Sequence, residues 1–202
     1  MKNLIILLFI FVTNFVKAQF IYDLVYEPKD GIIRLTKTDY ENNLSEIEID
    51  DKAHFKDKIL NVFPKDIKQD VLENDLDFYF SFVEKLNIDN QFTAVIVKYL
   101  IVYPMPDQGQ PITTNYNVVI YNKNTPVFSY PFTYTTSYEM VSDMPSKPQN
   151  DYSTGTISKN GNILNVEIKK PKINDYTKGT ITELHQISLV NGKWQGKFIS
   201  KK

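Results

Sequence analysis

The two histidines, His54 and His185, are the first candidates for chemistry, because imidazole titrates near neutral pH and binds metals. Neither has a second ligand at metal spacing, such as His-x-His or His-Glu-x-x-His. No Gly-x-Ser-x-Gly elbow nominates a nucleophile, although a His–Ser–Asp arrangement can assemble from distant positions. We therefore interpret each histidine as a surface or hydrogen-bonded residue, and we expect no catalytic residue among them.

Oxygen ligands gather at Glu73, Asn74, Asp75 and Asp77, but the glycine that a calcium loop needs for its tight turn is missing. We interpret this cluster as a polar connection. Cysteine is absent from the chain, which excludes disulfides, thiolate nucleophiles and Cys-ligated metals. The seven glycines are not clustered, so no loop of the phosphate-cradling type is present. We expect no metal and no cofactor.

An aromatic stripe is the feature that points most directly to a function. Phe128, Tyr130, Phe132 and Tyr134 alternate with small or polar residues, so a strand would carry all four rings on one face. Such a row can stack on sugar rings or receive apolar peptide side chains. Pro131 cannot donate a ladder hydrogen bond, which places the strand at an edge or a bulge, where a partner strand can add.

The same stripe has a plainer interpretation, in which it is the core face of a sheet. The tyrosines weaken this interpretation, because a fully buried tyrosine needs a partner for its hydroxyl. Both interpretations stay open. As a binding face, the stripe should leave Tyr130 and Tyr134 partly exposed.

The elements that would position these residues are mostly strands. Alternating or β-branched runs predict the strands 20–27, 32–37, 44–49, 92–103, 116–121 and 126–135. A turn at 28–31 should pair the first two strands. Helical spacing over 51–63 predicts a helix that Pro64 ends, and a second short helix follows. Residues 76–86 fit either a strand or a helix, and their aromatic density favours a strand.

The last third of the chain repeats itself. The sequence around Gly155 recurs around Gly179, twenty-four residues on, and Gly196 echoes it again; these glycines should allow bends or close approach of strands. Asn160-Gly161 and Asn191-Gly192 are strong hairpin signals. They predict a β-meander over 152–159, 162–169, 177–189 and 193–200. The fold class is therefore α+β and mainly β, an antiparallel sandwich or partly open barrel with one or two short helices.

The N-terminus predicts export. Lys2 precedes an apolar run of about thirteen residues, too short for a membrane-spanning helix, which needs about twenty. Residues 1–18 should form a signal peptide, cleaved before Gln19, and 19–202 a single domain with a candidate subdomain boundary at 142–151. With no cysteine to support disulfides, a bacterial periplasmic or secreted protein is expected, without a transmembrane segment after cleavage.

The charge excludes one class of partner. The formal net charge is −1 and Arg34 is the single arginine among 23 basic residues, so nucleic-acid binding is not expected. The function predicted from the sequence is a non-enzymatic binding module of the cell envelope or the secreted space, whose partner is an envelope protein or a glycan. The alternatives are a periplasmic or secreted hydrolase, a structural or assembly component of the envelope, and a small outer-membrane barrel.

Overall fold

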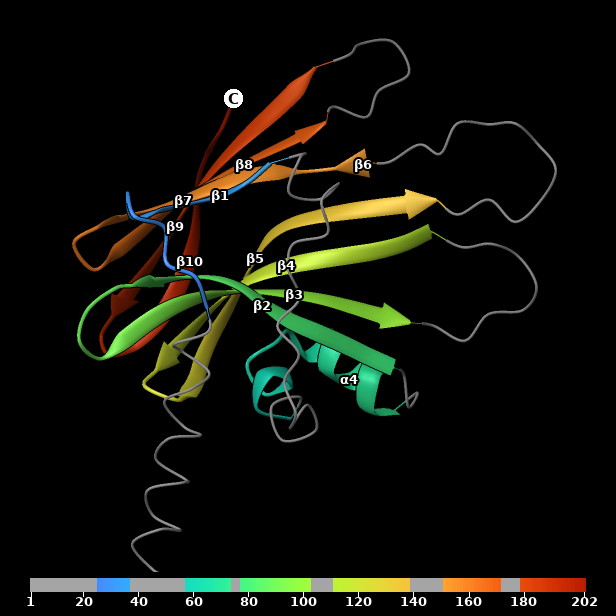
Figure 1. Ribbon diagram of the computed structural model, residues 1–202, viewed down its shortest axis with the longest axis horizontal. Coiled ribbons are helices and arrows are strands. Elements are labelled where there is room, and N and C mark those ends of the chain that lie inside the picture. The colour runs from blue at the N-terminus through green and yellow to red at the C-terminus, as the bar shows by residue number, and fades with distance from the viewer. Residues whose placement is uncertain (1–24, 37–56, 74–76, 103–110, 139–150, 172–178) are drawn as a thin grey trace, which may run out of the picture.

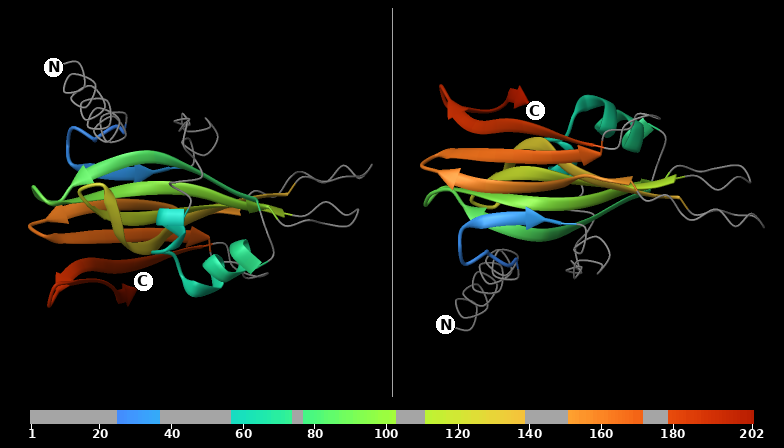
Figure 2. Two further views of the ribbon diagram at one scale, coloured as in Figure 1. Left: turned by 90° about the horizontal axis from the view of Figure 1, so that it is seen from below. Right: turned by 90° about the horizontal axis from the view of Figure 1, so that it is seen from above.

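The computed structural model describes residues 25–36, 57–73, 77–102, 111–138, 151–171 and 179–202. These residues form three layers, which Figure 1 shows from top to bottom: a five-stranded sheet, a second five-stranded sheet, and a short helical layer. Figure 2 shows the two sheets lying against each other along their length, without closing into a barrel. The predicted fold class is confirmed as a mainly β, antiparallel sandwich.

The middle sheet has the strand order β2-β3-β4-β5-β6 and is antiparallel throughout. Its strands are β2 (Asp77–Asn87), β3 (Phe92–Val102), β4 (Pro111–Asn122), β5 (Thr125–Tyr138) and β6 (Asp151–Tyr152). β3 and β4 are buried on both faces, as the apolar run 92–103 predicted for a central strand. The preference for a strand over a helix at 76–86 is also confirmed.

The outer sheet has the order β1-β7-β8-β9-β10. Its strands are β1 (Ile32–Leu35), β7 (Thr154–Asn160), β8 (Ile163–Pro171), β9 (Thr180–Val190) and β10 (Lys193–Lys201). The last four are the predicted C-terminal meander. β1 corrects a prediction, because it pairs with β7 and not with the segment before the Pro28–Gly31 turn. That turn carries the chain from Tyr26, bridged to Glu84 in the middle sheet, across to the outer sheet, where Ile33 and Leu35 are buried.

Both predicted Asn-Gly turns close hairpins, but the first is shifted by one residue. Val190 pairs with Lys193, and the central residues Asn191 and Gly192 both have positive φ, as in a type I′ turn. In the other hairpin Asn160 still pairs with Ile163, so Gly161 and Asn162 are central and only Gly161 has positive φ, as in a type II′ turn.

Replacing Gly161 or Gly192 with valine is expected to lower the free energy of unfolding by at least about 1 kcal/mol. No atom lies within 4 Å of an added Cβ at either glycine, so the cost comes from backbone strain at φ of +59° and +75° and not from a clash. Denaturant midpoints measure it. Gly192→Asn is the control, because asparagine tolerates positive φ. If valine and asparagine at 192 give equal midpoints, the strained turn is not the cause.

The helical layer covers the far side of the middle sheet. Residues 57–60 are helical, and α4 (Lys65–Glu73) begins after Pro64, whose carbonyl accepts the first bond of that helix from Lys68 N–H at 3.1 Å. Ile59, Leu60 and Val71 are buried against the sheet. None of the helices in the described part of the chain is long and apolar enough to cross a membrane.

Two cores result from the three layers. One lies between the sheets and draws residues from β1 to β5 and from β7 to β9, on both sides of the segment 142–151. The other lies between the middle sheet and the helices. Several predictions fall outside the described residues: the signal peptide 1–18, the strand 44–49, His54, and the acidic cluster at 74–75.

Candidate functional site

Strand β5 carries two β-bulges, and the second one shapes the site. Asn117 pairs with Pro131 and its neighbour Tyr116 pairs with Thr133, so Phe132 is an extra residue without a partner on β4. A bulge of this kind lets two successive side chains point to the same face and then reverses the alternation. Beyond Phe132, the side chains of β5 therefore exchange faces.

The bulge divides the predicted aromatic stripe. Phe128, Tyr130 and Phe132 point toward the core between the sheets; Phe132 is 3% exposed and the other two are partly buried. Tyr134 pairs with Asn115 and so lies on the opposite face, toward the helical layer, where it is partly exposed. The four rings do not share one face as the alternation predicted, because the extra residue shifts the period by one.

Two glycines of the outer sheet make room for these rings. A Cβ at Gly155 would lie 2.8 Å from Cζ of Phe132, and a Cβ at Gly196 would lie 2.9 Å from Cζ of Tyr130, with closer ring atoms in both cases. Both distances are too short for real carbon atoms. The repeated glycines of the C-terminal meander thus allow close approach, as the sequence predicted, and what approaches is an aromatic ring of β5.

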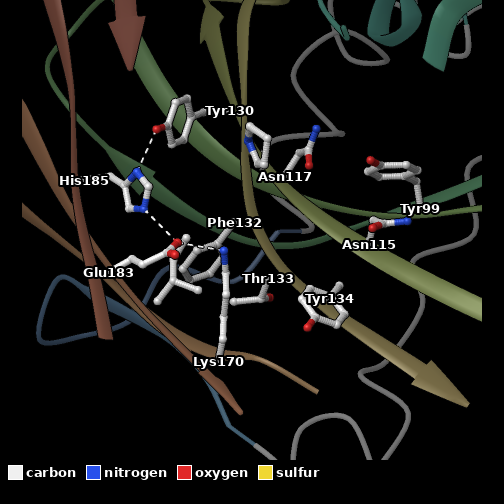
Figure 3. A pocket seen from close by; sticks show the side chains of 12 residues that line it. Tyr99, Asn115, Asn117, Tyr130, Phe132, Thr133, Tyr134, Lys170, Glu183 and His185 are labelled. Carbon is white, nitrogen blue, oxygen red and sulfur yellow. Dashed lines mark hydrogen bonds and ion pairs between the residues drawn. The ribbon is translucent and has the colours of Figure 1, made fainter. Parts of the chain in front are cut away.

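A pocket of about 300 Å³ opens at this edge of the middle sheet (Figure 3). β6 pairs with β5 only through Thr135 and Thr136, so the bulged part of β5 lies beyond that pairing. The pocket is lined from both faces of β5 and from β3, β4, β8 and β9: Tyr99, Asn115, Asn117, Tyr130, Pro131, Phe132, Thr133, Tyr134, Ile168, Lys170, Glu183 and His185. Figure 3 shows the charged residues and the asparagines on opposite sides of β5.

A chain of polar contacts forms one wall of the pocket. The Tyr130 hydroxyl lies 2.8 Å from Nδ1 of His185, and Nε2 of His185 lies 3.5 Å from Oε2 of Glu183. The same carboxylate oxygen accepts a hydrogen bond of 2.7 Å from Nζ of Lys170. The His185 ring also lies between two aromatic rings, with centroids 5.7 Å from Tyr130 and 5.4 Å from Phe198. Both imidazole nitrogens therefore face groups of the protein.

The contacts of this wall favour the ionised form of Glu183 and the neutral form of Tyr130. The hydrogen bond from Lys170 lowers the pKa of Glu183 below its ordinary value, against the opposing effect of burial. Burial raises the pKa of Tyr130, and the charge of Glu183 adds to the rise. At neutral pH Glu183 is a carboxylate and Tyr130 a neutral phenol, so both groups keep one protonation state across the physiological range.

Glu183→Gln is expected to cost up to about 1 kcal/mol of stability at pH 7, as for a partly exposed ion pair. Because the folded pKa of Glu183 is lowered, the unfolded chain binds more protons in acid, so this stabilisation is present above the unfolded pKa and is lost as pH falls through the folded pKa. The difference in denaturant midpoint between the two proteins should therefore shrink below about pH 4. A difference that does not change with pH would show that the ion pair with Lys170 does not stabilise the fold.

The other wall of the pocket presents neutral polar groups. Asn117 is 2% exposed and donates from Nδ2 to Oγ of Ser129 at 3.0 Å, and its Oδ1 has no partner among the described residues. The side chain of Asn115 and the hydroxyl of Tyr134 likewise make no hydrogen bond within that part of the chain. The backbone of Tyr134 is fixed by Ser153, which donates N–H to its carbonyl at 2.9 Å and accepts its N–H at 2.8 Å.

Sequence reasoning identified Tyr130 and Tyr134 but missed the residues opposite them. Of the two interpretations of His185, surface or hydrogen-bonded, the second holds, because its side chain is 11% exposed and its Nδ1 lies 2.8 Å from the Tyr130 hydroxyl. Glu183 and His185 are two apart on β9, so they share a face with the buried Ile187, and this spacing was a signal in the sequence. Lys170 and Asn117 carried no such signal, since their role depends on how the two sheets face each other.

The chain matches no known family model, no curated protein and no solved structure at a significant level. The geometry of the pocket is therefore the basis on which a function is argued.

Proposed function

We propose that this protein is a non-enzymatic binding module of the bacterial cell envelope or the secreted space, which holds its ligand in the pocket beside β5. The observation that carries the proposal is that Asn115, Asn117 and Tyr134 line one pocket with polar groups that make no hydrogen bond to another described residue. Binding sites of this kind combine apolar and aromatic walls with a few placed polar groups. Residues 1–18 have the sequence pattern of a signal peptide, which supports a location outside the cytoplasm.

The wall that Tyr130, Glu183 and His185 form supports binding over hydrolysis. A general acid or base works best with a pKa near the working pH. The two pocket groups with shifted pKa values, Tyr130 and Glu183, both move away from neutrality. Nδ1 of His185 lies 2.8 Å from the Tyr130 hydroxyl, and Nε2 is buried 3.5 Å from the Glu183 carboxylate without a hydrogen bond in the described part of the chain. These contacts hold this wall of the pocket in shape.

Tyr134→Ala is expected to weaken retention of the ligand roughly three- to tenfold, because it removes a partly exposed ring from the pocket wall. The measurement is retention of envelope material on the immobilised protein across a dilution series. Thermal unfolding should change little, since the backbone bonds of residue 134 to Ser153 remain.

Tyr79→Ala is the matched control. Tyr79 is 54% exposed on β2 and does not line the pocket, so its loss should leave retention unchanged. If Tyr134→Ala retains as much material as the wild type, the pocket is not the binding site and the proposed function fails.

A further inference from the structure

We infer that the ligand of this pocket is an uncharged sugar residue of a glycan, and not an extended peptide. The inference rests on the proposed function and names the chemical class of its ligand. It follows from the edges of the two sheets, the size of the pocket, its charge and the geometry of its free polar groups.

The edge of β5 is poorly suited to an added peptide strand. Strand addition needs a regular row of backbone donors and acceptors. Pro126 and Pro131 supply no N–H, and bulges at Val127 and Phe132 interrupt the register of β5 with β4. Prolines and bulges are two of the devices by which natural sheets protect their edges from other strands.

The edge of the outer sheet at β10 is protected in another way. β10 is the last strand of the outer sheet and carries exposed Lys193, Lys197 and Lys201, and a bulge at Ile199 breaks its register. Lysines on an edge strand oppose pairing with a further strand. The edges at β5 and β10 thus both work against the recognition mode that would suit a peptide.

The charge of the pocket is balanced internally. Lys170 and Glu183 are in contact at 2.7 Å, so the cation that would attract a carboxylate or a phosphate already has a partner. An anionic ligand would have to compete with Glu183 for that ammonium group. A ligand without charge does not meet this competition, and its hydroxyl groups can both donate and accept.

The neutral polar groups that line the pocket fit an uncharged sugar. The Tyr134 phenol, the Asn115 amide and Oδ1 of Asn117 offer both donors and acceptors in their uncharged forms. The partly exposed Tyr134 ring and the exposed Pro131 add flat apolar surface, and an aromatic face is where a sugar ring stacks. A volume of about 300 Å³ is at the small end for ligand pockets and suits one ring more than several.

The test compares three kinds of purified probe by titration and ligand-observed NMR: neutral hexose oligosaccharides, their uronic-acid counterparts, and extended peptides of mixed sequence. We expect at least one neutral oligosaccharide to bind, and its uronic-acid counterpart to bind no more tightly. Tyr134→Phe keeps the ring and removes the hydroxyl, so it should weaken that binding roughly three- to tenfold. Tyr79→Phe, on the exposed face of β2, should leave it unchanged.

Two results would overturn the inference without touching the proposed function. One is binding of peptides or acidic sugars in preference to neutral ones, with loss on Tyr134→Phe. The other is Tyr134-dependent retention of envelope material that contains no sugar after acid hydrolysis and survives periodate oxidation. Failure of the proposed function differs from both, because Tyr134→Ala would then leave retention of envelope material unaltered.

Discussion

Phe132→Ala is expected to lower the free energy of unfolding by about 3–5 kcal/mol, the largest effect of any substitution considered in this protein. Phe132 is 3% exposed, and its ring fills the space between β5 and Gly155 of β7. Alanine at position 132 would therefore leave a cavity that the packed sheets cannot easily close. Equilibrium unfolding in denaturant measures the loss.

Val127→Ala is the matched control for this substitution. Val127 is the extra residue of the other bulge in β5 but is 41% exposed, so its truncation should cost less than about 0.5 kcal/mol. Equal costs at 127 and 132 would mean that the Phe132 ring is not part of the core between the sheets.

Gly155→Ala is expected to destabilise the wild type by about 1–3 kcal/mol, because its new methyl group overlaps the Phe132 ring and lies 2.9 Å from Cγ2 of Thr133. In the Phe132→Ala background most of that overlap is gone. The same glycine substitution should then cost less, giving a coupling energy of about 0.5–3 kcal/mol between the two sites.

Gly196→Ala provides the contrast in the same double-mutant cycle. Its methyl group meets Tyr130 and not Phe132, so its cost should be nearly the same in the wild type and in Phe132→Ala. If Gly155→Ala is equally additive with Phe132→Ala, the ring does not occupy the space beside Gly155, and the packing of the two sheets described above is wrong at this point.

Much of the fold could be predicted because its signals are local. The run from Phe92 to Val102 is apolar on both faces, which predicts a central strand, and β3 is an interior strand of its sheet, between β2 and β4. The Asn-Gly dipeptides predict hairpins because few residues tolerate positive φ, and both hairpins form. Pro131 predicts an edge or a bulge, and it lies at both.

Pairing between distant strands was harder to predict. β1 was expected to pair with its neighbour in sequence, but it pairs with β7, more than a hundred residues away. The burial of Ile33 and Leu35 between the two sheets requires β1 to lie in the outer sheet, and no pattern within the strand itself records this requirement.

The candidate site was predicted only in part. The sequence singled out Tyr130 and Tyr134 as the aromatic residues that a binding face would leave partly exposed, and both line the pocket. Their common face was an error of register, because one extra residue at Phe132 turns Tyr134 to the other side of the sheet. His185 was interpreted as a surface or hydrogen-bonded residue, but its contact with Tyr130 could not be predicted, because Tyr130 is on a distant strand of the other sheet.

The sequence by itself determined the class of fold, the hairpins and the irregular strand at Pro131, because strand period, turn chemistry and proline act within a few residues of the chain. Tertiary structure alone decided that Tyr130 meets His185, that Lys170 neutralises Glu183, and that Asn117 faces the same pocket. The contacts of His185 with Tyr130 depend on how the two sheets pack against each other, which the whole core determines. The place of Asn117 in the pocket depends on the register of β4 with β5, which the extra residue Phe132 shifts by one.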